Sequence, residues 1–259
     1  MSGKDSRFDH LEMERTRPQA APEPRGRTFD PAEYVTRALD LELSGDWDGA
    51  LRLYSRALSS LPHLEEAWVG QLRCLVRQED FHEAAMWAGK ALEYLPKSGA
   101  ILAMQAIALA GEGQLSEALA LSDRAIQMSG NSPAVWLARA WALGRDKEES
   151  AGRCLRKAVE VAQDDVRWLL EAGALYLRWE KFGAALEQLQ RAVTLRPALA
   201  APWHLVGVCR LKLGMADEAE QAFSQAVRLA PGVKRYRERL EESRGVTWWT
   251  SLWRRLVRR

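Results

Sequence analysis

One spacing constrains this chain more than any other feature: alanine returns at the same place in six consecutive units. The intervals between these alanines are 34, 34, 33, 34 and 34 residues. The six are Ala50, Ala84, Ala118, Ala151, Ala185 and Ala219. Seven residues after each comes another alanine, at Ala57, Ala91, Ala125, Ala158, Ala192 and Ala226. A fixed period of about 20–50 residues is the mark of a repeat architecture, in which stacked units share one continuous core.

The first half of each unit is periodic as well. A mostly large apolar position recurs at Tyr34, Trp68, Leu102, Val135, Leu169 and Trp203. Four residues later the side chain is usually small, at Ala38, Leu72, Ala106, Arg139, Gly173 and Gly207. Such spacings place side chains on one face of a helix. Proline closes most units because it cannot continue a helix, so each unit is predicted to be two helices.

These residues resemble the tetratricopeptide repeat, a unit of two antiparallel helices and about 34 residues. The sixth unit matches the family pattern best, with Trp203, Val206, Gly207, Ala219, Phe223, Ala226 and Pro231. The resemblance covers about residues 31–231 and implies an all-α, right-handed solenoid with a concave groove. The predicted domain spans 29–231, and its six repeats are 31–64, 65–98, 99–131, 132–164, 165–199 and 200–231.

The fourth repeat departs most from the pattern. Arg139 stands where a small residue is expected, the repeat is one residue short, and it lacks a closing proline. We expect a slightly altered stacking angle there and no break in the array.

The two ends differ in kind from the repeats. Residues 1–28 are rich in proline and charge and poor in apolar side chains, which predicts a disordered tail. Residues 232–245 are predicted to form a helix that caps the last repeat with Val233, Tyr236 and Leu240 and ends at Gly245.

Residues 246–259 form a tail rich in tryptophan and arginine, which is predicted to be an amphipathic helix too short to span a bilayer. Its candidate docking residues are Trp248, Trp249, Leu252, Trp253, Arg254, Arg255, Arg258 and Arg259. Such a helix suits the headgroup region of an anionic membrane, through residues 247–259. Packing on the chain itself, self-association and docking to another protein are the alternatives. Nucleic-acid binding is not expected, because the net charge is only +2 and four terminal arginines offer no reading element.

No residue pattern nominates an enzyme, a metal site or a cofactor. Cys74, Cys154 and Cys209 lie far apart in the sequence, and no histidine has metal-ligand spacing with another histidine or a cysteine. The sequence contains no phosphate-binding loop and no nucleophile elbow. We therefore expect no catalysis.

The resemblance also implies which side chains line the groove. The candidate partner-binding residues are Arg73, Arg77, Ile107, Trp136, Leu170, Arg178, His204 and Lys212. Arginine pairs with carboxylates in fork geometry, which suggests an extended or helical peptide with apolar anchors and acidic residues. Packing between repeats is the alternative role for each residue.

Two functions follow from these features. The first is a cytoplasmic scaffold or adaptor that binds a protein or peptide in its groove. The alternative is a peripheral membrane assembly factor anchored by its C-terminal helix.

Overall fold

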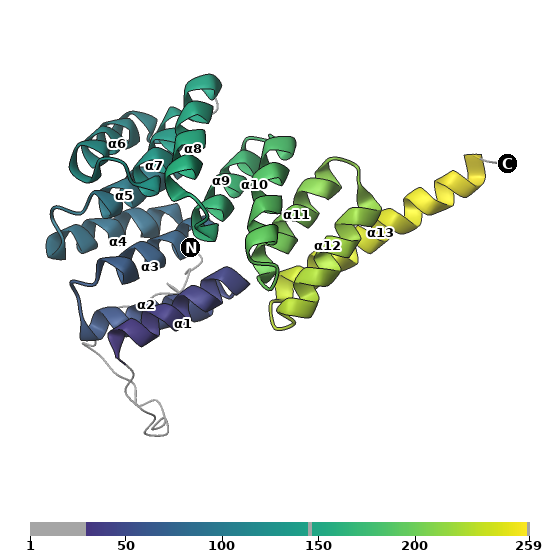
Figure 1. Cartoon of the computed structure of the whole chain (residues 1–259), viewed down its shortest axis with the longest axis horizontal. Coiled ribbons are helices and arrows are strands. Elements are labelled where there is room, and N and C mark those ends of the chain that lie inside the picture. The colour runs from purple at the N-terminus through teal and green to yellow at the C-terminus, as the bar shows by residue number, and fades with distance from the viewer. Residues whose placement is uncertain (1–29, 145–146, 258–259) are drawn as a thin grey trace, which may run out of the picture.

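The computed structural model describes residues 30–144 and 147–257. For the segment 246–257 it describes only the helical backbone. The predicted disordered tail, residues 1–28, lies outside the described residues. Within these ranges the secondary structure is entirely α-helical, in successive pairs followed by one long helix (Figure 1). The bounds are α1 Pro31–Ser44, α2 Trp47–Ser60, α3 Glu65–Arg77, α4 Phe81–Tyr94, α5 Gly99–Gly111, α6 Leu115–Ser129, α7 Pro133–Leu143, α8 Glu148–Ala162, α9 Val166–Arg178, α10 Phe182–Leu195, α11 Ala200–Lys212, α12 Ala216–Leu229 and α13 Lys234–Val257.

The repeated alanines hold the helix pairs together. All twelve alanines of the two registers are buried, because only a small side chain lets two helices approach closely. Gly207 serves the same purpose in the sixth repeat, where an added Cβ would lie 2.7 Å from the Phe223 ring. The all-α solenoid predicted from the sequence is confirmed.

The fourth repeat keeps its place in the array despite Arg139. The Arg139 guanidinium reaches the Ser122 hydroxyl at 3.2 Å and forms an ion pair with Asp123. The charge is thus carried out of the packed interface between helices. Helices α7 and α8 both contact α9, so the array continues into the fifth repeat as expected.

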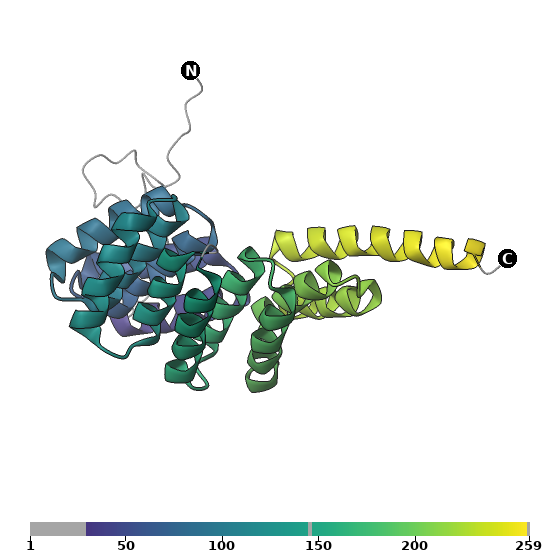
Figure 2. The ribbon, with the colours of Figure 1, turned by 90° about the horizontal axis from the view of Figure 1, so that it is seen from above.

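The array closes on itself. The end of α1 lies beside the start of α13 in both views (Figures 1 and 2), and α1 also contacts α11. Tyr236 Oη donates to the Ser44 carbonyl at 2.9 Å, and Arg235 donates to the Gly45 carbonyl at 2.8 Å. The Arg235 guanidinium stacks on the Trp47 ring, 3.4 Å from its centroid. The first repeat therefore packs against the helix that follows the last one.

Helix α13 caps the last repeat, as predicted, but it does not end at Gly245. Buried Tyr236 and Leu240 pack on the sixth repeat. The helix continues to Val257 and projects beyond the array (Figure 2). Gly245 does not adopt the left-handed φ that would end a helix. The tryptophan- and arginine-rich sequence after it is compatible with a helix. None of the described helices is both long and apolar enough to cross a bilayer.

Candidate partner-binding cavity

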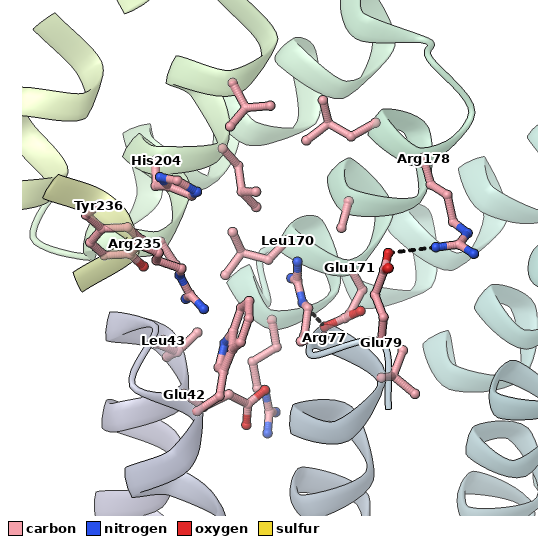
Figure 3. Close-up of a pocket in the computed structure, with 18 of the residues that line it drawn as sticks. Glu42, Leu43, Arg77, Glu79, Leu170, Glu171, Arg178, His204, Arg235 and Tyr236 are labelled. Atoms are coloured by element: carbon pink, nitrogen blue, oxygen red, sulfur yellow. Dashed lines mark hydrogen bonds and ion pairs between the residues drawn. The ribbon is translucent and has the colours of Figure 1, made fainter. Parts of the chain in front are cut away.

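Closure of the array turns the concave groove into a cavity of about 380 Å³ (Figure 3). One wall comes from α9 and α11, and the opposite wall from α3, the end of α1 and the start of α2 (Figure 3). The first turn of α13 closes one end with Arg235 and Tyr236. Much of the lining is apolar, and the side chains that give it this character include Leu170, Leu177, Leu205, Val208, Phe81 and Trp141.

Five of the eight predicted groove residues line this cavity. They are Arg77, Leu170, Arg178, His204 and Lys212. The other three do not, and the structure gives each a packing role. Arg73 and Ile107 are buried at 3% and 1% exposure. Trp136 is half-buried against the core and donates from Nε1 to Asn131 Oδ1 at 2.9 Å.

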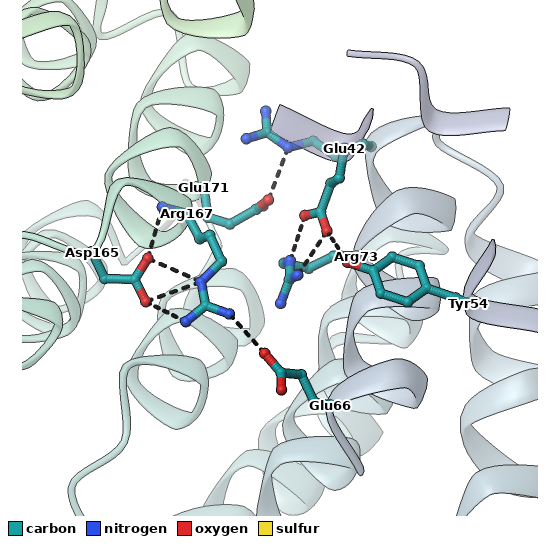
Figure 4. A network of polar contacts seen from close by, with 8 residues as sticks. Glu42, Tyr54, Glu66, Arg73, Asp165, Arg167 and Glu171 are labelled. Carbon is teal, nitrogen blue, oxygen red and sulfur yellow. Dashed lines mark hydrogen bonds and ion pairs between the residues drawn. The ribbon is translucent and has the colours of Figure 1, made fainter. Parts of the chain in front are cut away.

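Arg73 is held in a buried network with two residues of the first repeat (Figure 4). Its Nε and Nη2 donate to the Glu42 carboxylate at 2.6 and 2.7 Å, and Tyr54 Oη donates to the same carboxylate at 2.8 Å. Burial and the neighbouring Glu42 raise the pKa of Tyr54, so its hydroxyl remains a donor. Arg73 therefore fixes the stacking of repeats one and two and cannot reach a partner.

Two further arginines are paired across the cavity rather than free. Arg77 Nε donates to Glu171 at 2.8 Å, and both side chains are largely buried. Arg178 pairs with Glu79 at 2.8 Å (Figure 3) and lies over the Phe81 and Trp141 rings, 5.2 Å from each centroid. The expectation of open arginines awaiting an acidic partner fails for both, because acids on the facing repeats already occupy them.

Arg167 makes a third connection between the fifth and second repeats. It pairs with Asp165 at 2.7 Å and with Glu66 at 3.5 Å (Figure 4). Repeats two and five are thus joined by several polar contacts spanning about a hundred residues of sequence.

His204 lies at the α13 end of the cavity. Its ring centroid is 4.6 Å from that of Tyr236. Burial, with the nearby positive charges of Arg235 and Arg239, lowers the pKa of His204 to about 3, so the ring is neutral at physiological pH. Its buried Nδ1 has no hydrogen-bond partner among the described residues.

Sequence reasoning missed the residues that the facing repeats and α13 contribute. Trp47, Glu171 and Arg235 all line the cavity. The only signal for them in the sequence was a set of acidic residues near the groove arginines. Whether these acids pair with the arginines depends on how far the array curves.

The described part of the chain contains no group of three or more His, Cys, Asp and Glu side chains that could hold a metal ion. The three cysteines are free thiols, and burial raises the pKa of Cys74 and Cys209. These thiols are therefore poor nucleophiles.

The fold is that of a helical-repeat solenoid, the architecture typical of protein-interaction scaffolds. A family model for the tetratricopeptide repeat matches residues 35–98 and 170–234, and the same alanine register runs through the residues between them. The chain belongs to the tetratricopeptide-repeat family, whose members are generally scaffolds for protein interactions and not enzymes.

Two curated proteins are related in sequence. The chain is 27% identical to Protein CTR9 homolog of Arabidopsis thaliana over 122 residues. This match covers 46% of this chain and 11% of that protein. The chain is 23% identical to BBSome complex member BBS4 of Bos taurus over 188 residues. This match covers 72% of this chain and 36% of that protein. The chain spans well under half the length of either relative.

Solved structures that match include the APC/C hetero-tetramer Cut9–Hcn1 and YrrB, a TPR protein with an unusual peptide-binding site. The first has 11% identity and a TM-score of 0.49, over 83% of this chain and 43% of that chain. The second has 15% identity and a TM-score of 0.43, over 71% of this chain and 96% of that chain.

Proposed function

We propose that this protein is an adaptor that holds a segment of a partner protein in the cavity between its first and last repeats. The observation that carries the proposal is the cavity itself, with apolar walls and cationic side chains at its edges. Sites of this kind bind through a few anchored side chains, with polar groups that fix orientation. By its name, the relative BBSome complex member BBS4 is part of a complex. We propose that this protein, too, works within a multiprotein assembly.

The volume of the cavity limits which kind of segment it can hold. A volume of about 380 Å³ is near the lower end of ligand pockets, which run from about 300 to 1,000 Å³. A helix with its side chains is about 10–12 Å across, so it needs a wider space than an extended segment. We therefore favour an extended segment over a helical one.

Replacing Ala174 by tryptophan should abolish partner binding without unfolding the protein. Ala174 lines the cavity on α9, so the larger ring would occupy the space of the partner's anchor. The probe is a phage-displayed library of random twelve-residue peptides, selected against the full chain and against the variant.

The matched control is Gln221→Trp, which adds the same ring at an exposed position on α12 outside the cavity. Peptides enriched by the unmodified protein and by Gln221→Trp, but not by Ala174→Trp, support the proposal. Equal enrichment by all three proteins, or by none, would contradict it.

A second candidate, a peripheral membrane role, is favoured by α13. This helix continues to Val257, and its last turns project away from the array (Figure 1). The sequence of those turns carries Trp248, Trp249 and Trp253 among arginines, and a tryptophan- and arginine-rich helix suits a membrane interface. Arg258 and Arg259 lie outside the described residues.

Removal of residues 247–259 should abolish binding to anionic vesicles if the tail is an anchor. The measurement is co-sedimentation of the full chain and of residues 1–246 with phosphatidylserine-containing and pure phosphatidylcholine vesicles. The anchor predicts pelleting of the full chain only, with anionic vesicles only. Equal behaviour of both chains would contradict it, and sedimentation velocity without lipid would then show whether the tail drives self-association.

A further inference from the structure

The charges around the cavity do not balance. Its lining contains five cationic and three acidic side chains, which are Arg77, Arg167, Arg178, Lys212 and Arg235 against Glu42, Glu79 and Glu171. Arg77, Arg167 and Arg178 each have an acidic partner. Lys212 and Arg235 form no ion pair within the described residues, and Glu42 is already occupied by Arg73. Two positive charges at the cavity therefore lack a counter-charge.

These two cations mark opposite ends of one apolar strip. His204, Val208 and Lys212 recur at intervals of four residues and all line the cavity, so they share one face of α11. The eight steps from His204 to Lys212 correspond to about 12 Å at a rise of about 1.5 Å per residue. Val208 lies midway, with Leu205 beside it.

Arg235 is fixed at the His204 end. Its guanidinium carbon lies 5.1 Å from the Tyr236 ring centroid, and the Tyr236 ring is 4.6 Å from that of His204. Stacking on Trp47 and the bond to the Gly45 carbonyl hold the group in place. The buried Arg235 Nε and His204 Nδ1 both lack a hydrogen-bond partner in the described part of the chain. Buried polar atoms of this kind are usually paired, so two unpaired atoms at one end of a cavity point to a ligand.

We infer that the cavity recognises an extended acidic segment in which two carboxylate side chains, about four residues apart, flank an apolar side chain. An extended chain advances about 3.3 Å per residue, so four residues span about 13 Å, close to the rise of about 12 Å along α11 from His204 to Lys212. Alternate side chains of such a segment face the same way. The first and fifth residues would therefore point toward Arg235 and Lys212, and the third toward Val208. This inference rests on the proposed function.

The two ends of the strip should differ in how they hold a carboxylate. At the Arg235 end the cation is immobilised and stacked, and a carboxylate can pair with the guanidinium. Neutral His204 adds hydrogen bonding without charge. At the other end Lys212 is exposed and flexible, so its attraction is less directional and more strongly screened by salt.

Replacing Lys212 by glutamate tests the inference because it reverses one charge and leaves the other. The probe is again the library of random twelve-residue peptides. The unmodified protein should enrich sequences with two acids about four positions apart and an apolar residue midway. The Lys212→Glu variant should keep one acidic position and exchange the other for lysine or arginine, and it should bind the original peptides about tenfold more weakly.

Lys97→Glu is the matched control, because Lys97 is exposed at the α4–α5 turn and does not line the cavity. It should select the same peptides as the unmodified protein. Enriched peptides without paired acids, or a preference that Lys212→Glu leaves unchanged, would overturn the inference while the proposed function stands. Failure of the unmodified protein to enrich any peptide would overturn both.

Discussion

Replacing Glu42 by alanine should lower the free energy of unfolding by about 3–5 kcal/mol, the usual cost of removing one partner of a buried ion pair. Arg73 is 3% exposed, and its guanidinium donates two hydrogen bonds to the Glu42 carboxylate. The substitution would leave a charge buried without a counter-charge and would remove the acceptor of the Tyr54 hydroxyl. Urea denaturation followed by circular dichroism measures the loss.

A triple variant separates the cost of the orphaned charge from the value of the network. Glu42→Leu, Arg73→Met and Tyr54→Phe together remove the charges and the hydroxyl while keeping apolar bulk. Replacing a complete buried ion pair by packed apolar groups is often neutral or stabilising, so the triple variant should recover most of the stability. A triple variant as unstable as Glu42→Ala would show that the network contributes more than the avoidance of a buried charge.

Replacing Gly45 by alanine should destabilise the protein by about 2–5 kcal/mol and release the start of α13 from the first repeat. Gly45 has a left-handed φ of 91°, and an added Cβ would lie 2.0 Å from Tyr236 Oη. The backbone cost is about 1–2 kcal/mol, and overpacking adds about 1–3 kcal/mol. Hydrogen exchange of residues 233–240 should accelerate along with the loss of stability.

Gly214→Ala supplies the matched control. Gly214 occupies the same turn in the sixth repeat with φ 79°, but nothing lies within 4 Å of its added Cβ. This variant should show only the backbone cost, with hydrogen exchange of α13 unchanged. Equal effects of the two substitutions would mean that contact between Gly45 and α13 contributes nothing to stability.

The sequence predicts the fold well because the repeat is local. Each alanine of the two registers, which lie seven residues apart, meets its neighbours within its own or the adjacent repeat. A period of 34 residues is therefore enough to identify the fold. Even Arg139 is accommodated locally, by pairing with Asp123. Closure of the array is different, because it results from small rotations summed over six repeats. No single residue spacing encodes that sum.

At the candidate site, too, the sequence predicts local features but not contacts between distant repeats. The family resemblance indicated one helical face, and Leu170, His204 and Lys212 on that face line the cavity. It did not reveal that Glu171 would neutralise Arg77 from the facing wall. The continuation of α13 past Gly245 was also missed, because a glycine can end a helix or be tolerated within one at a cost of about 1 kcal/mol.

The most direct test of this account is the distance between the first repeat and the start of α13 in solution. Spin labels at Asp40→Cys and Arg237→Cys, both exposed positions, would report it by double electron–electron resonance in a Cys154→Ala background. The closed array predicts one narrow distribution at the short distance expected for neighbouring elements. A broad distribution at long distances would show an open array, and the cavity proposed to bind the partner would then not exist.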